Sequence, residues 1–86
     1  MPELSRFYGI VIRMYFGDHS PPHFHAIYGG SKAAVDIETL TFISGELPPR
    51  VRGLVVEWAT IHQDELRTAF RNAQAMETPE KIAPLD

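Results

Sequence analysis

Three of the four histidines fall within seven residues, as His19, His23 and His25. An imidazole ring ligates transition metals and carries a proton near neutral pH, so this segment holds the candidate site. Pro21 and Pro22 stiffen the stretch between the first two histidines, which predicts an ordered loop. The sequence has no cysteine, which excludes disulfides and thiolate metal ligands.

The pair Gly29–Gly30 predicts a two-residue hairpin turn, because both positions tolerate positive φ. Counting outward from this turn, His23 faces Asp36 and His25 faces Ala34. The two histidines are two residues apart on one strand, so both rings point to the same side. Two histidines and a carboxylate form the ligand set of many open metal sites. The candidate ligands of a divalent transition metal are therefore His23, His25 and Asp36.

Two other interpretations of the histidine group stay open. The rings of His19, His23 and His25 are candidates for catalytic proton transfer or for binding a polar ligand. A cross-strand His–Asp pair also occurs on solvated sheet faces with a purely structural role. The sequence contains no P-loop, no dinucleotide-binding glycine motif and no zinc-protease helix motif, so no organic cofactor is indicated.

His62 stands apart, in the apolar stripe of the predicted helix. Its structural interpretation is a neutral buried histidine with one satisfied hydrogen bond. Glu65, three residues further along, lies at the border of the same stripe, within reach of the His62 ring. The alternative is that His62 meets His19 at the sheet edge. That alternative conflicts with the hairpin register, because a helix on the apolar hairpin face lies away from the two strand histidines.

Hydrophobic periodicity predicts the elements that position these residues. The alternation of apolar side chains predicts strands over 7–16, 23–28, 31–38 and 41–44; a 3.6-residue period predicts a helix over 49–76, followed by a tail over 77–86. Both faces of the first segment are partly apolar, which favours a central strand. The expected fold class is α+β: a three- to four-stranded antiparallel meander with one long helix packed on a sheet face, in a single domain over 1–86.

The predicted helix begins near Pro49 and would extend about 40 Å, which is longer than so small a sheet. Gly53 is its weakest point, because glycine disfavours a helix interior. The far end, near Phe70 and Met76, is therefore expected to contact a protein partner or a second copy. The predicted core residues are Ile10, Ile12, Met14, Phe24, Val35, Val55, Trp58 and Leu66.

Charge and the N-terminal sequence limit the partners. The formal net charge is −3 with neutral histidines, which disfavours nucleic acid, since its binding usually needs a basic surface. The N-terminus lacks the pattern of a signal peptide, and no apolar run is long enough to span a membrane. We therefore expect a cytoplasmic protein without a membrane partner.

Several segments of the sequence match a family pattern. They are Ser5–Ile10, the stretch Asp18–Ala26 with its Pro-Pro-His-Phe-His string, Tyr28–Gly30, Asp36–Glu38, Leu47–Pro48 and Glu57–Leu66. With them the chain resembles the small bacterial family catalogued as domain of unknown function 4160. That family has no established activity, so the resemblance transfers no catalytic residue. One departure is Thr39-Leu40-Thr41, where the family often has a glycine turn.

Members of this family are often encoded beside another small uncharacterised domain, which implies a protein partner. The first functional hypothesis is therefore a protein-interaction module, as one component of a toxin–antitoxin-like pair. The alternative is a small metal- or histidine-dependent hydrolase of the phosphodiesterase or nuclease type, which uses the histidine-rich loop and hairpin. A third hypothesis is a structural domain whose histidines only order the loop.

Overall fold

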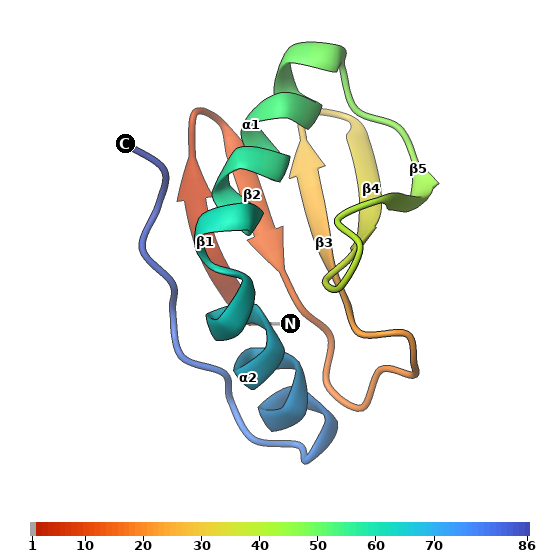
Figure 1. Cartoon of the computed structure of the whole chain (residues 1–86), viewed down its shortest axis with the longest axis vertical. Helices are drawn as coiled ribbons and strands as arrows, with labels where there is room; N and C mark the ends of the chain where they lie inside the picture. The colour runs from red at the N-terminus through yellow and green to blue at the C-terminus, as the bar shows by residue number, and fades with distance from the viewer. Residues whose placement is uncertain (1) are drawn as a thin grey trace.

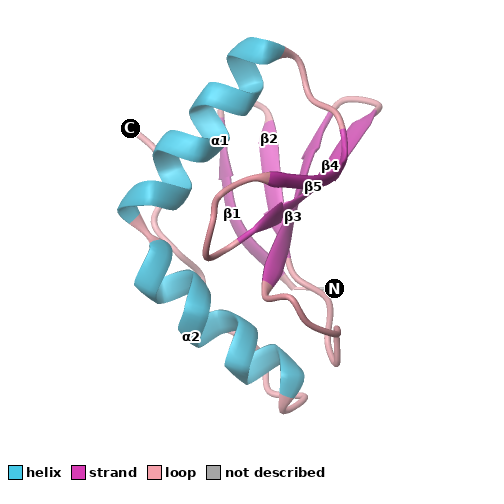
Figure 2. Cartoon of the chain, turned by 45° about the vertical axis from the view of Figure 1, so that its right-hand side comes forward, coloured by secondary structure: helices cyan, strands magenta, loops and turns pink. Residues whose placement is uncertain are grey.

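Five antiparallel strands form one sheet in chain order, and two helices cover one of its faces (Figures 1 and 2). The computed structural model describes residues 2–86. The α+β class and the antiparallel meander are confirmed, whereas the predicted three to four strands and single helix are wrong in number. The elements are β1 (Glu3–Phe7), β2 (Ile10–Arg13), β3 (His23–Tyr28), β4 (Ser31–Asp36), β5 (Phe42–Gly45), α1 (Pro49–Ile61) and α2 (Gln63–Gln74).

The segment predicted as one strand over 7–16 is two strands joined by a tight turn at Tyr8 and Gly9. These two residues have φ values of 50° and 78°, as in a type I′ hairpin turn. Asn-Gly is the usual sequence of such a turn. Here Tyr8 occupies the first turn position, and because an aromatic residue continues the apolar alternation, the sequence pattern does not reveal the turn. β1 pairs with β2 from Phe7 opposite Ile10. β2 is therefore an interior strand, and β1 lies at the sheet edge.

The β3–β4 hairpin has the predicted register. Gly29–Gly30 connects the strands, His23 lies opposite Asp36, and His25 lies opposite Ala34. β3 has the predicted bounds of 23–28. The apolar face of the hairpin is buried in the core and consists of Phe24, Ala26, Ala33 and Val35.

β4 ends at Asp36, two residues before the predicted end, because the chain turns there. The Asp36 carbonyl accepts the N–H of Leu40 at 2.8 Å, and Leu40 has a φ of 59°. That left-handed conformation favours glycine, so Leu40 adopts it at a cost in backbone strain. β5 then covers Phe42–Gly45 in place of 41–44, with an irregular register against β4.

The helix predicted over 49–76 begins where predicted but is interrupted at His62, and not at Gly53. His62 has φ −111° and ψ 24°, outside the helical region. A straight helix of this length would extend about 40 Å, whereas the longest extent of the molecule is 33 Å. The interruption lets α2 follow the end of the sheet, where the Gln63 side chain donates to the Ile37 carbonyl at 2.7 Å.

The far end of the helical region is covered by the chain's own residues. Of the two residues expected to contact a partner, Phe70 is 2% exposed, and Met76, which lies beyond α2, is 68% exposed. The Gly17 N–H donates to the Ala73 carbonyl at 2.9 Å, which attaches the β2–β3 loop to the last turn of α2. The overlong helix that motivated a partner surface is therefore absent from the fold.

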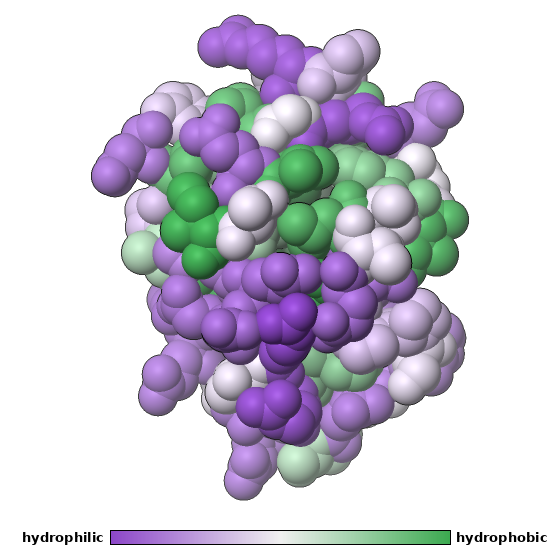
Figure 3. All heavy atoms as spheres, in the orientation of Figure 1, coloured by the Kyte–Doolittle hydropathy of each residue, from purple (hydrophilic) through white to green (hydrophobic). Residues whose placement is uncertain are grey.

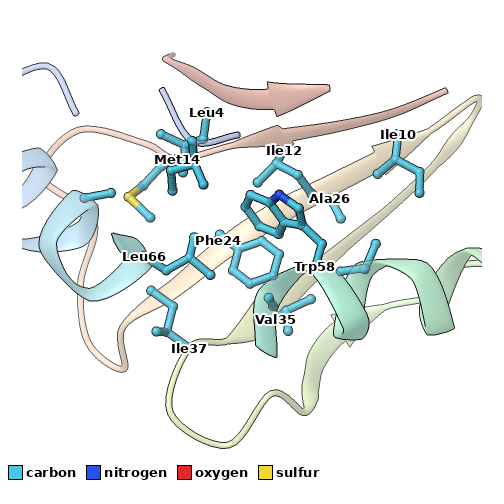
Figure 4. Packing of buried hydrophobic residues seen from close by; sticks show 14 of the residues in the cluster. Leu4, Ile10, Ile12, Met14, Phe24, Ala26, Val35, Ile37, Trp58 and Leu66 are labelled. Carbon is cyan, nitrogen blue, oxygen red and sulfur yellow. The ribbon is translucent and has the colours of Figure 1, made fainter. Parts of the chain in front are cut away.

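The core lies between the sheet and the helices, around Trp58 (Figure 4). The ring of Phe24 lies 5.8 Å from it, edge-on. Trp58 Nε1 donates to the Ala83 carbonyl at 2.8 Å, and the Ile82 N–H donates to the Leu4 carbonyl at 2.8 Å. The C-terminal tail thus runs beside β1. All eight predicted core residues are buried.

The surface over the helices is mixed in hydropathy. Figure 3 shows hydrophilic atoms at both ends of this face and a hydrophobic region in its upper half. The largest exposed apolar side chains belong to separate elements and turns: Tyr8, Phe16, Tyr28, Ile43, Ile61 and Met76. None of the helices within residues 2–86 has the length and apolar character needed to cross a bilayer.

Candidate functional site

The β3 strand presents His23 and His25 on the side of the sheet that faces away from the core. The rings are 5.1 Å apart, edge to face. His23 lies at the start of the strand, where its ring is 5.9 Å from Phe70 of α2. The two side chains are 8% and 14% exposed. Both rings are therefore largely buried, and they extend to the same edge of the site.

Asp18, in the loop between β2 and β3, supplies the carboxylate at this edge. Its Oδ2 lies 2.9 Å from His23 Nε2 and 3.6 Å from His25 Nε2. Its Oδ1 accepts the backbone N–H of His19 at 3.0 Å, and its carbonyl accepts from Gln74 of α2 at 3.4 Å. The end of α2 and the loop backbone thus hold the carboxylate against both rings.

The protonation of His23 follows from its partners. His23 Nδ1 lies 2.6 Å from the Pro21 carbonyl. A carbonyl oxygen only accepts hydrogen bonds, so Nδ1 carries a hydrogen. In the neutral ring, Nε2 then carries no hydrogen, and its lone pair points at the Asp18 carboxylate. Such a pair is stable only when a cation, either a proton or a metal ion, lies between the two atoms. This arrangement, with the second ring nitrogen donating to a carbonyl, is common among metal-ligating histidines.

His25 has a different environment. Its Nε2 is buried and has no hydrogen-bond partner among residues 2–86, and the Tyr15 ring packs edge-on at 4.3 Å. Burial, together with the charges of His23 and Lys32, lowers the pKa of His25, and the nearby Asp18 only partly opposes this. Burial therefore favours the neutral imidazole of His25, which is the form that binds a metal.

Asp18 is ionised beside these rings. Burial favours its neutral form, but the His19 N–H and the charges of the histidines outweigh burial, so the pKa of Asp18 lies below its usual value. Ligand atoms of Asp18, His23 and His25 all lie within 4.8 Å of one another. These three residues, the Asp18 cluster, therefore offer two ring nitrogens and one carboxylate to a metal ion.

The structure separates Asp36 from the histidines with which it was predicted to bind metal. Asp36 lies opposite His23 in the backbone register. Its Oδ1, however, accepts the N–H groups of Glu38 and Thr39 at 2.7 and 3.0 Å. The side chain thus closes the turn after β4 and does not contribute to the Asp18 cluster. Asp18 takes its place, and a carboxylate five and seven residues before the histidines was the available sequence signal.

His19 lies at the rim of the cluster. Its ring centroid is 6.1 Å from that of His23, and its Nδ1 is 3.0 Å from the Ser20 carbonyl. Because that carbonyl can only accept, the His19 Nδ1 carries a hydrogen, and in the neutral ring Nε2 is free to accept a proton. His19 is thus placed beside the cluster without being one of its three ligands.

His62 and Glu65 form a second, separate pair at the interruption between α1 and α2. His62 Nδ1 lies 2.6 Å from Glu65 Oε1, and its ring is 5.4 Å from Trp58. His62 lines a hollow shared with the C-terminal tail, whereas His19 lines the hollow of the Asp18 cluster. The predicted Glu65 contact is present, and a four-histidine site is not formed.

The Asp18 cluster opens onto a hollow of about 430 Å³. Besides the cluster and His19, its lining consists of Tyr15, Pro21, Lys32, Ala34, Ile43 and Ser44. The three residues of the cluster therefore line one concave surface that is open to solvent. Its lining combines the three potential ligands with a lysine and two hydroxyl-bearing side chains.

Comparison with known proteins assigns a family. The family model described as "Domain of unknown function (DUF4160)" matches residues 9–71. This stretch includes Asp18, His23 and His25. Neither the search of curated proteins nor the search of solved structures finds a match.

Proposed function

Because the chain belongs to the DUF4160 family, whose description assigns no activity, we propose its function from the geometry of the site. We propose that Asp18, His23 and His25 bind a divalent transition metal ion and that the protein is a small metal-dependent hydrolase. Two imidazole nitrogens and one carboxylate suit a zinc-like ion that keeps open coordination positions.

The observation that carries the proposal is the convergence of three ligand atoms within 4.8 Å of one another. Two ligands of a tetrahedral ion with bonds of 2.1 Å lie about 3.4 Å apart. The Asp18 oxygen is 2.9 and 3.6 Å from the two nitrogens, on either side of that value. A proton on His23 would explain its contact with Asp18 but would leave His25 Nε2 without a partner. A metal ion satisfies all three atoms.

The chemistry follows from this ligand set. A metal ion held by Asp18, His23 and His25 would lower the pKa of a bound water. His19, at the rim of the cluster, would accept the proton of that water on its Nε2. In phosphodiester hydrolysis the water oxygen bonds to phosphorus, the P–O ester bond breaks, and the proton passes to the leaving oxygen. The reaction needs no co-reactant other than water.

Metal binding is tested with untagged, chelator-stripped protein titrated with Co²⁺ and followed by visible absorption. We expect one ion per chain. Asp18→Asn keeps the shape of the side chain, and His25→Gln keeps a polar group. Each is expected to weaken binding by more than about 100-fold, beyond what loss of an outer-shell partner costs. His62→Gln is the matched control and should bind as wild type does. Equal affinity in all four proteins, or no binding to wild type, contradicts the proposal.

Activity is tested with bis(p-nitrophenyl) phosphate and the metal-loaded protein. We expect turnover that Asp18→Asn abolishes. His19→Gln should lower the rate by about 100-fold, the lower end of general acid–base contributions, while Co²⁺ affinity stays unchanged. Equal turnover in wild type and Asp18→Asn would assign the activity to a contaminant and contradict the hydrolase.

A second candidate function is binding of a protein partner or second copy, as in a toxin–antitoxin-like pair. The observation that favours it is the exposure of two apolar side chains: Phe16, two residues before Asp18, is 38% exposed, and Met76, after α2, is 68% exposed. Sedimentation velocity over a range of concentrations tests the second copy. Association that Met76→Ser weakens would support it, and a wild-type monomer at the highest soluble concentration would contradict it.

A further inference from the structure

The hollow beside the Asp18 cluster is formed by a small residue between larger ones. Across the sheet His25 pairs with Ala34, and Ala34 pairs with Ser44. The methyl group of Ala34 therefore forms the floor, with an imidazole on one side and a hydroxyl group on the other. Ile43 also lines the hollow, near the irregular register of β5. The floor lies directly beside a ligand of the proposed metal.

Lys32 supplies a positive charge to the same hollow. It lies two residues before Ala34 on β4, so its side chain starts from the same face of the sheet. Its Nζ donates to the Tyr15 hydroxyl at 2.7 Å, and the Tyr15 ring packs on His25. Within the part of the chain that the structure describes, Lys32 forms no ion pair with a carboxylate. Its charge is therefore available to a ligand.

We propose that this hollow binds the phosphoryl group of a small phosphate ester, with one oxygen toward the metal and another toward Lys32. The inference rests on the proposed metal site and names its substrate class. A divalent ion with one carboxylate ligand has one net positive charge, and Lys32 adds a second. The Ser44 hydroxyl is a further donor on the opposite wall. Two positive charges and directed donors match a tetrahedral oxyanion.

The surroundings favour a small ester over a nucleic-acid strand. Lys32 is the only lysine or arginine that lines the hollow among residues 2–86, and the net charge of the chain is −3. A polynucleotide requires several cations along its backbone, because neutralised phosphates supply most of its affinity. The positive charge of the site suits one phosphoryl group and does not suit the several phosphates of a polynucleotide.

The probe is inorganic phosphate, titrated into Co²⁺-loaded protein and followed by the change in cobalt absorption. Lys32→Gln should weaken phosphate binding by about 10- to 100-fold, the range for a lost hydrogen bond to a charged group. Lys81→Gln removes the only other lysine, which lines a different hollow, and should bind phosphate as wild type does. Ala34→Leu fills the floor and should abolish phosphate binding; a Co²⁺ titration and a thermal melt of the same variant check that the metal site and the fold persist.

The outcomes separate the two proposals. If Co²⁺ does not bind, both the metal site and this inference are overturned. If Co²⁺ binds but Lys32→Gln leaves the phosphate affinity unchanged, only the phosphoryl site is overturned. Phenyl phosphate should compete with inorganic phosphate at a similar concentration. An oligothymidylate that competes more than tenfold better per molecule would overturn the assignment to small esters.

Discussion

Two regions of this protein pair histidine with a carboxylate, and they differ in how the pair is built. At the interruption between the helices, His62 and Glu65 are three residues apart, and the Glu65 side chain is 54% exposed. In the loop–hairpin cluster, Asp18 meets both His23 and His25, and its side chain is only 18% exposed. The first pair is local and solvated at the carboxylate. The second joins two segments in a largely buried setting.

This difference indicates which region is suited to chemistry. A local i, i+3 pair whose carboxylate is exposed stabilises the fold by a few tenths of a kcal/mol and needs no ligand. In the cluster, the buried Nε2 of His25 has no hydrogen-bond partner. The Nε2 of a neutral His23 points its lone pair at the Asp18 carboxylate, and this contact needs a proton or a metal ion between the two atoms. The satisfied local contact favours a structural role for His62, and the unsatisfied atoms of the cluster support its proposed role in metal binding.

The largest effect is expected in the structural region. Trp58 is fully buried, lies beneath His62 and donates to the C-terminal tail. Trp58→Ala should lower the free energy of unfolding by about 3–5 kcal/mol, because it leaves a cavity and an unpaired carbonyl. Urea denaturation measures the change. A variant with a nearly unchanged midpoint would show that the helix region does not depend on this residue.

A smaller effect is expected at His62 itself. His62→Ala removes a largely buried ring and its contact with Glu65, and should cost about 1–2 kcal/mol. The stoichiometry and affinity of Co²⁺ binding should not change. His25→Ala is the comparison variant and should lose the ion. If His62→Ala loses the metal and His25→Ala retains it, the roles assigned to the two regions are exchanged.

Sequence reasoning was reliable where local chemistry set the geometry. Gly29–Gly30 determined the hairpin register, and with it the common side of His23 and His25. The contact of Glu65 with His62 followed from helical spacing. Each of these depends on neighbours along the chain or on one well-defined turn.

Sequence reasoning failed where tertiary contacts overrode a local pattern. Tyr8 takes a turn conformation that its type disfavours, so the alternation over 7–16 concealed a hairpin. The helix is interrupted at His62, although neither glycine nor proline stands there. Asp18 was missed as a ligand although its spacing from the two histidines was a signal, because that spacing does not show the attachment of the loop to α2 through Gly17 that positions the carboxylate.

Asp36 provides a test of that last point. Asp36→Ala should cost about 1 kcal/mol, comparable to loss of a helix cap, because its carboxylate accepts two backbone N–H groups. Co²⁺ affinity should remain within about twofold of wild type. Urea denaturation and cobalt titration of Asp36→Ala beside Asp18→Asn measure both quantities. Loss of the ion in Asp36→Ala alone would restore the ligand set predicted from sequence.

The smallest effect is a pH dependence that distinguishes the two regions in chelator-treated protein. Burial, the charge of His23 and that of Lys32 lower the pKa of His25 below its usual 6.5, with Asp18 opposing them. As pH falls below 6.5, unfolded chains protonate His25 while folded chains resist, so the unfolded state binds more protons and stability declines. Asp18 adds a further loss in strong acid, because its pKa is also lowered from 3.8.

His25→Gln should remove the first part of this decline, between pH 6.5 and the lowered pKa of His25, and leave the loss in strong acid. His62→Gln, the matched control, should keep both parts. Urea midpoints measured from pH 7.5 to pH 3 give the comparison. Added Zn²⁺ should raise the midpoint of wild type at pH 7.5, and progressively less in acid, because protons compete with the ion for the same nitrogens. If His25→Gln follows the wild-type pH profile, the buried imidazole is not the group that resists protonation, and the contrast with His62 loses its electrostatic basis.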